Sequence, residues 1–118
     1  GTVLIVARCD EGIGGPEFTD LLLSTPSVEE FAQRLEDPDF FVIDQWQLQE
    51  LCKVLRKANV MMYSEGIQDQ HRDSVLVEMV PSVEDAIARV LNERGADARI
   101  AVIPKGPYVL SKLQEVVP

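Results

Sequence analysis

The chain has 118 residues, 46% of them hydrophobic, which suits a single domain with one apolar core and leaves no room for a second full domain. A net charge of -9 repels phosphate backbones, so we expect no nucleic-acid partner. The apolar runs are far shorter than the ~20 residues that span a bilayer, and no charged leader is evident, so we expect a cytoplasmic protein with no membrane partner.

The first expected element is a strand. Residues 2–7 form a continuous apolar run rich in β-branched side chains, which is typical of a strand buried on both faces. A flexible glycine-containing loop follows at residues 10–15. Pro16 then predicts the first turn of a helix, because its fixed φ suits that position. The apolar residues at helical spacing in this helix are Phe18, Leu21 and Leu22.

Two more helices are expected before the middle of the chain. Ser27 and Glu30 form a capping box, and Pro38 lies where this helix should have ended. Its apolar face consists of Val28, Phe31, Ala32 and Leu35. Asp44 predicts the cap of the next helix, with Gln47 as its reciprocal partner. The apolar stripe of that helix consists of Leu48, Leu51, Cys52, Leu55 and Ala58.

The second half of the chain predicts three further strands and one helix. Residues 60–64 and 75–80 have the composition of buried strands, and residues 99–103 predict another. Ser82 predicts the cap of a helix that stops at Gly95. The apolar face of this helix consists of Val83, Ala86, Ile87, Val90 and Leu91.

Strands that alternate with helices predict the α/β class, with a mainly parallel sheet of about four strands and helices on its faces, in a Rossmann-like three-layer arrangement. Ligands bind such sheets beyond the carboxyl ends of the strands. The candidate site loops are therefore residues 8–15, 64–66 and 104–106. We expect residues 1–118 to be one domain. Because a strand follows Gly1 at once, without an initiator Met, we expect this domain to be the end of a longer polypeptide.

The glycine loop has two interpretations. Gly12 and Gly14 match the first two glycines of a dinucleotide-binding fingerprint, and such turns can present backbone amides to an anion. The third glycine position is Glu17, however, and Pro16 lacks an amide donor. The pattern therefore favours a structural or interdomain turn over a nucleotide site.

Metal and nucleophile chemistry have little support in the sequence. Cys9 and Cys52 lie in dissimilar settings, and neither has a Cys or His at metal-ligand spacing. A disulfide between them is one alternative, and reduced cytosolic thiols are the favoured one. The only histidine, His71, lies in a polar run and is interpreted as a solvated loop residue. We expect no metal ligand and no catalytic residue in this chain.

The only tryptophan has an unusual place. If a helix begins after Asp44, steps of ~100° per residue put Trp46 opposite the stripe that contains Leu51 and Cys52. Its indole N–H and the nearby helix amides would then favour an anionic group such as a carboxylate. The alternative is that Trp46 packs under the Phe40-Phe41 segment, and the residues alone leave the two interpretations even.

Three segments, in this order and spacing, resemble the C-terminal domain of the nickel-dependent lactate racemase family. They are residues 6–18 (VARCDEGIGGPEF), residues 43–46 (IDQW) and residues 102–107 (VIPKGP). The resemblance covers nearly the whole chain. One departure is Ile13, where some relatives carry a histidine, and it leaves the polarity of the cleft open.

The resemblance implies a two-domain enzyme that racemises or epimerises 2-hydroxy acids by reversible hydride transfer to a nickel-pincer nucleotide. The family's acid/base histidines, its cofactor-tethering lysine and its nickel-binding histidine belong to an N-terminal domain that this sequence does not contain. The implied partners are thus that N-terminal domain and a small 2-hydroxy acid, and no cofactor is expected on the isolated domain.

What carries over to this chain is a substrate-binding role rather than a catalytic one. Trp46 matches the family's active-site tryptophan, with Gln45 beside it on the substrate. The implied supporting residues are Asp44, Gly12, Gly14 and Gly15. The alternative from another class is a non-catalytic ligand-sensing or interaction domain with the same fold. Histidines and a lysine in the family's pattern upstream of Gly1 would distinguish the enzyme from that alternative.

Overall fold

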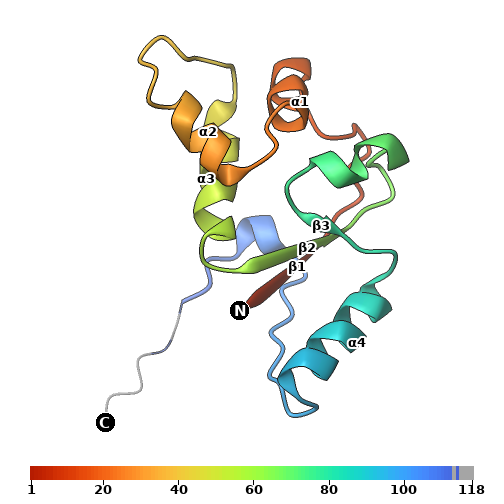
Figure 1. Ribbon diagram of the computed structural model, residues 1–118. Helices are drawn as coiled ribbons and strands as arrows, with labels where there is room; N and C mark the ends of the chain where they lie inside the picture. The colour runs from red at the N-terminus through yellow and green to blue at the C-terminus, as the bar shows by residue number, and fades with distance from the viewer. Residues whose placement is uncertain (113, 115–118) are drawn as a thin grey trace.

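A computed structural model describes residues 1–112 and 114, and Figure 1 shows one small sheet with helices packed around it. The predicted α/β class is confirmed, but the described residues form three strands rather than about four. The strands are β1 (Thr2–Val6), β2 (Asn59–Tyr63) and β3 (Glu78–Met79). The helices are α1 (Pro16–Leu23), α2 (Val28–Arg34), α3 (Gln45–Leu55) and α4 (Val83–Arg94), with two 3₁₀ helices, η1 (Asp69–Ser74) and η2 (Gly106–Tyr108).

The sheet is parallel throughout, in the order β1-β2-β3. Residues of β1 pair with β2 from Thr2 opposite Asn59 to Val6 opposite Tyr63. The shorter β3 pairs only with the middle of β2, Met61 opposite Glu78 and Met62 opposite Met79. All three strands therefore end at the same edge of the sheet, where the loops that follow β1 and β2 begin.

The predicted starts of three helices are confirmed. Helix α1 begins at Pro16, and the capping serines of α2 and α4 both form the expected bonds. The Ser27 hydroxyl accepts a hydrogen bond from the Glu30 amide at 3.1 Å, and the Ser82 hydroxyl accepts one from the Asp85 amide at 3.0 Å. These bonds satisfy amides that would otherwise lack a partner in the first turn of each helix.

We predict that Ser27→Ala lowers the free energy of unfolding by about 1 kcal/mol, because the Glu30 amide loses its partner within the chain. Urea denaturation of the wild type and the variant measures the difference. Ser74→Ala is the control, since Ser74 is exposed and lies outside the α-helices. Equal midpoints for Ser27→Ala and the wild type would show that this cap does not stabilise α2.

The predicted cap of α3 is wrong. Asp44 occupies the N-cap position with φ 65° and makes no side-chain capping bond, so it forms no reciprocal pair with Gln47. A capping side chain reaches the helix amides from a residue in the extended region, and Asp44 is left-handed instead. The turn is held by Gln45, whose Oε1 accepts a hydrogen bond from the Val42 amide at 2.7 Å.

Two apolar clusters lie on the two sides of the sheet, as Figure 1 indicates from the placement of α3 and α4. The larger cluster is centred on α1, α2 and α3 and includes Phe31 and Leu48. The smaller one joins Met61 and Val80 to Ala86 of α4. The successive residues Met79 and Val80 contact different clusters, as side-chain alternation along an extended chain requires.

The burial predicted for β1 is wrong. The strand lies at an edge of the three-stranded sheet, and Val3, Ile5 and Val6 are 43%, 39% and 59% exposed. A continuous apolar run indicates burial on both faces, but burial depends on which elements cover the strand.

In α4 only Ala86 of the predicted stripe is fully buried, and Ile87 is 37% exposed.

Two predicted strands are shorter or absent. Only Glu78–Met79 of residues 75–80 is a strand. Val75 is instead the C-cap of η1, and Leu76 has φ 62°, which interrupts an extended conformation. Residues 99–103 form no strand, and Val102 is 81% exposed.

Within the described residues, no helix is long and apolar enough to cross a membrane.

Candidate functional site

The loops after β1 and β2 meet at the carboxyl edge of the sheet, as predicted for residues 8–15 and 64–66. The Gly66 amide donates a hydrogen bond to the Arg8 carbonyl at 2.9 Å, and the Ser64 hydroxyl donates to the same oxygen at 3.0 Å. Among the described residues, the backbone bonds of the third predicted loop, residues 104–106, are all local, such as that from the Tyr108 amide to the Lys105 carbonyl. The structure therefore brings together two of the three candidate loops.

The glycine loop has an irregular backbone that its own hydrogen bonds hold. The Gly12 amide donates to the Cys9 carbonyl at 2.8 Å, and the Thr19 hydroxyl donates to the Gly14 carbonyl at 3.2 Å. Gly12 and Gly14 have φ values of 76° and 146°, which L side chains rarely adopt. Gly15 is the N-cap of α1, where glycine has no side chain that could cap the helix.

Trp46 lies on the first turn of α3 and is 60% exposed. The buried face of this helix contains Leu48 and Cys52, at 0% and 4% exposed. The prediction that the core stripe of α3 does not bury Trp46 is therefore confirmed. Within the described part of the chain, no hydrogen bond occupies the Trp46 indole N–H or joins Trp46 to the glycine loop.

The backbone around Trp46 is partly occupied. The Gln45 amide donates to the Val42 carbonyl at 3.1 Å, and the Gln47 amide donates to the Asp44 carbonyl at 3.0 Å. These two amides cannot serve a ligand without breaking those bonds. Among the described residues, the side-chain donors here without a hydrogen bond are the Trp46 indole N–H and the Gln45 NH2. The first turns of α1, α2 and α4 each carry an acidic residue, whereas that of α3 carries none. The acidic group beside the positive end of α3 is instead Asp44, at the N-cap.

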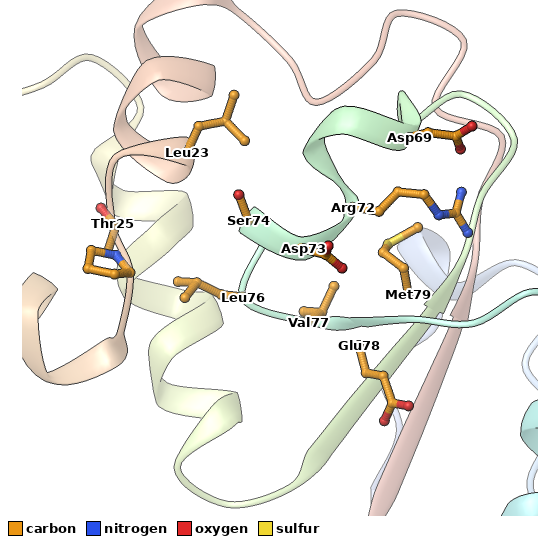
Figure 2. Close-up of a pocket in the computed structure, with 11 residues that line it drawn as sticks. Leu23, Thr25, Asp69, Arg72, Asp73, Ser74, Leu76, Val77, Glu78 and Met79 are labelled. Atoms are coloured by element: carbon orange, nitrogen blue, oxygen red, sulfur yellow. The ribbon is translucent and has the colours of Figure 1, made fainter.

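A cavity of about 830 Å³ lies between the end of α1, η1 and residues 76–79 (Figure 2). Its lining contains Asp69, Asp73 and Glu78 against one cation, Arg72. None of the residues that the sequence predicted for the site lines it. The excess of acidic groups opposes binding of a carboxylate there.

Arg72 has a structural role that no sequence pattern predicted. This half-buried side chain donates hydrogen bonds to the Ser64 carbonyl at 3.3 Å and the Val80 carbonyl at 3.4 Å, so it joins the ends of β2 and β3. Arg72 belongs to the polar run of residues 68–73, which was interpreted as a solvated loop. That run forms η1 instead, in which His71 is half-buried and lies 3.4 Å from the Gln70 side-chain nitrogen.

The clearest electrostatic perturbations lie away from Trp46 and the glycine loop. A hydrogen bond from Arg89 lowers the pKa of the exposed Glu78 carboxyl below its ordinary value, and burial raises the pKa of the Cys52 thiol. In the glycine loop, the Arg8 Nε and Asp10 Oδ1 atoms are 3.2 Å apart, but both side chains are well exposed. Such a pair contributes little to stability because water screens it.

The described residues do not offer a metal-binding set. Among the described residues, no three His, Cys, Asp or Glu side chains are placed to hold a metal ion, and Cys9 and Cys52 are both free thiols. The donors present here do not fit nickel, which prefers several nitrogen, oxygen or sulfur ligands in one defined geometry.

The fold and this edge define a small parallel α/β domain with two joined loops at the carboxyl ends of its strands and an exposed tryptophan on a neighbouring helix. The chain belongs to the lactate racemase C-terminal domain family, whose model matches residues 1–111. It is 27% identical over 114 residues to lactate racemase from Lactiplantibacillus plantarum (strain ATCC BAA-793 / NCIMB 8826 / WCFS1), a match that covers 95% of this chain and 27% of the relative. The chain therefore spans about a quarter of that relative's length.

Proposed function

We propose that this chain is the C-terminal domain of a cytoplasmic enzyme that racemises or epimerises a small 2-hydroxy acid. The family and its similarity to a lactate racemase support the reaction class. The observation within the chain that supports a substrate-facing role is the exposed Trp46, which points an unused donor away from its own helix's core.

The proposed role of Trp46 is to bind the carboxylate of the substrate. Its indole N–H donates one hydrogen bond to that carboxylate. Gln45 is the second proposed substrate contact, through its side-chain NH2, because its Oε1 already accepts from Val42. Asp44 and the glycine loop, with Gly12, Gly14 and Gly15, are the proposed supports.

The family resemblance assigns hydride transfer to a nickel-pincer nucleotide, which an N-terminal domain would hold. Because the side chains described here do not fit a metal site, this chain's share is to bind and orient the substrate and to cover the cleft. An apolar, water-poor cleft strengthens each hydrogen bond made to the substrate.

We predict that Trp46→Phe lowers kcat/KM for the preferred substrate at least about tenfold, because the donor to a reacting anion is lost and ~1.4 kcal/mol is a factor of ten in rate. The measurement uses the longer parent protein, loaded with the nickel cofactor, and a panel of chiral 2-hydroxy acids. The variant should unfold close to the wild type, since Trp46 is 60% exposed.

Val54→Ala is the matched control, because Val54 lies on the same helix and is 42% exposed. It should keep wild-type turnover. Full racemisation by Trp46→Phe, together with a clear loss of stability, would show that Trp46 packs rather than binds. A wild-type parent that racemises no member of the panel would contradict the proposed function and favour a sensing or interaction domain.

A further inference from the structure

The Ser64 side chain makes a long-range bond that the proposed function has not used. Ser64 is 2% exposed, and its hydroxyl donates to the Arg8 carbonyl, 56 residues away in the chain, at 3.0 Å. The same hydroxyl accepts a hydrogen bond from the Gly66 amide at 3.2 Å. The Gly66 amide also reaches the Arg8 carbonyl, at 2.9 Å. We call Ser64, Gly66 and the Arg8 carbonyl the loop clamp.

Gly66 has a steric role in the loop clamp. A Cβ atom at this position would lie 1.9 Å from the Cys9 carbonyl oxygen and 2.5 Å from the Arg8 carbonyl oxygen. Both neighbours are backbone atoms, which cannot move aside as the end of a side chain can. Only glycine allows the two loops to approach this closely.

The loop clamp acts at the point where the glycine loop leaves the sheet. Cys9, the next residue after Arg8, is left-handed with φ 53°, a conformation that is costly for a residue with a Cβ. Such a conformation persists only where the surroundings enforce it. The Cys9 carbonyl in turn accepts the bond from Gly12 that shapes the glycine loop. The conformation enforced at Cys9 therefore sets the direction of residues 10–15.

We propose that Ser64 and Gly66 are positioning residues, which hold the glycine loop in the shape that the proposed substrate cleft requires. The inference rests on the proposed function, because it assumes that the glycine loop supports the cleft. The Ser64 hydroxyl fixes the Arg8 carbonyl from the second loop, so the loops after β1 and β2 move as one unit. Neither residue needs to touch the substrate.

The test compares Ser64→Ala with Ser82→Ala in the cofactor-loaded parent protein. Ser64→Ala removes the hydroxyl but leaves the direct bond from the Gly66 amide to the Arg8 carbonyl, so no buried backbone group is orphaned and the variant should fold. Ser82→Ala removes a helix cap on α4, and it controls for a similar general loss of stability away from the loops.

Amide hydrogen exchange and steady-state kinetics are the two measurements. In Ser64→Ala we expect roughly fivefold to tenfold faster exchange in the peptide that covers residues 8–15, with unchanged exchange in α4, because one hydrogen bond is lost locally. We also expect a fall of about tenfold in kcat/KM per cofactor-loaded site, since small displacements in a site have large effects on rate. Ser82→Ala should leave both quantities at their wild-type values.

Unchanged exchange in residues 8–15 would overturn the proposal, and so would faster exchange with unchanged kcat/KM. The same loss of kcat/KM in Ser82→Ala would overturn it too, because the effect would then be one of general stability. A wild-type parent without activity on the panel would instead contradict the proposed function and the catalytic half of this proposal. The exchange experiment would still decide whether Ser64 orders the glycine loop.

Discussion

Phe31→Ala should lower the free energy of unfolding by about 3–5 kcal/mol, the range for deletion of a buried aromatic side chain. Phe31 is 1% exposed in the larger apolar cluster. Its ring meets that of Phe40 edge to face, with centroids 6.4 Å apart and an interplanar angle of 75°. Truncation therefore removes both buried area and a favourable aromatic pair, and it leaves a cavity. Chemical denaturation of the chain measures the loss.

Phe41→Ala is the matched control, because it makes the same substitution at a ring that is 78% exposed. The change in its free energy of unfolding should stay within about 0.5 kcal/mol. If the two variants lost similar stability, the placement of α2 against α3 and the Phe40 loop would be wrong.

Gly66→Ala should lower the free energy of unfolding by about 3 kcal/mol, near the upper end of the range for inserting a group into a packed site. The added methyl group meets the Arg8 and Cys9 carbonyl oxygens, so the loop clamp must open. Opening it also strips hydrogen bonds from the buried Ser64 hydroxyl. The midpoint of denaturation should fall without a change in the slope against denaturant.

Gly106→Ala is the control for the effect of the substitution itself, because a Cβ there would have nothing within 4 Å. It should be neutral or slightly stabilising, since alanine restricts the unfolded chain. An equal midpoint for Gly66→Ala and Gly106→Ala would mean that the two loops can separate at no cost.

The helix starts could be predicted because their signals are local. Pro16, Ser27 and Ser82 each act on backbone groups within about one turn, and the structure confirms all three. The prediction from local signals fails at Asp44. Its side chain has the chemistry of a cap, but the left-handed backbone of Asp44 itself keeps that side chain from reaching the helix amides.

The burial of strands could not be predicted from their composition alone. Residues 2–6 and 99–103 both have apolar, β-branched sequences, but one forms an edge strand and the other forms no strand among the described residues. A strand needs a partner for its backbone groups and a layer for each face, and both lie far away in sequence. Apolar side chains show that a segment can be buried, but they do not show which other element covers it.

The candidate site was predicted in part. The period of α3 placed Trp46 off the buried stripe, and the parallel sheet predicted that the loops after β1 and β2 meet. The substrate contacts of Trp46 and Gln45 remain predictions. The bonds of Ser64 and Arg72 could not be predicted, because each depends on carbonyl groups that only the folded sheet brings within reach.

The separation of Arg8 and Ser64 along the chain has a kinetic consequence. Bringing together two points 56 residues apart costs about 3–4 kcal/mol in chain entropy, whereas each helical bond closes only a few residues. Helices α1, α2 and α3 all lie within that span, so they can form and collapse onto one another before β1 finds β2. We therefore expect the glycine loop to take its final shape only when β1 pairs with β2, after these three helices have formed.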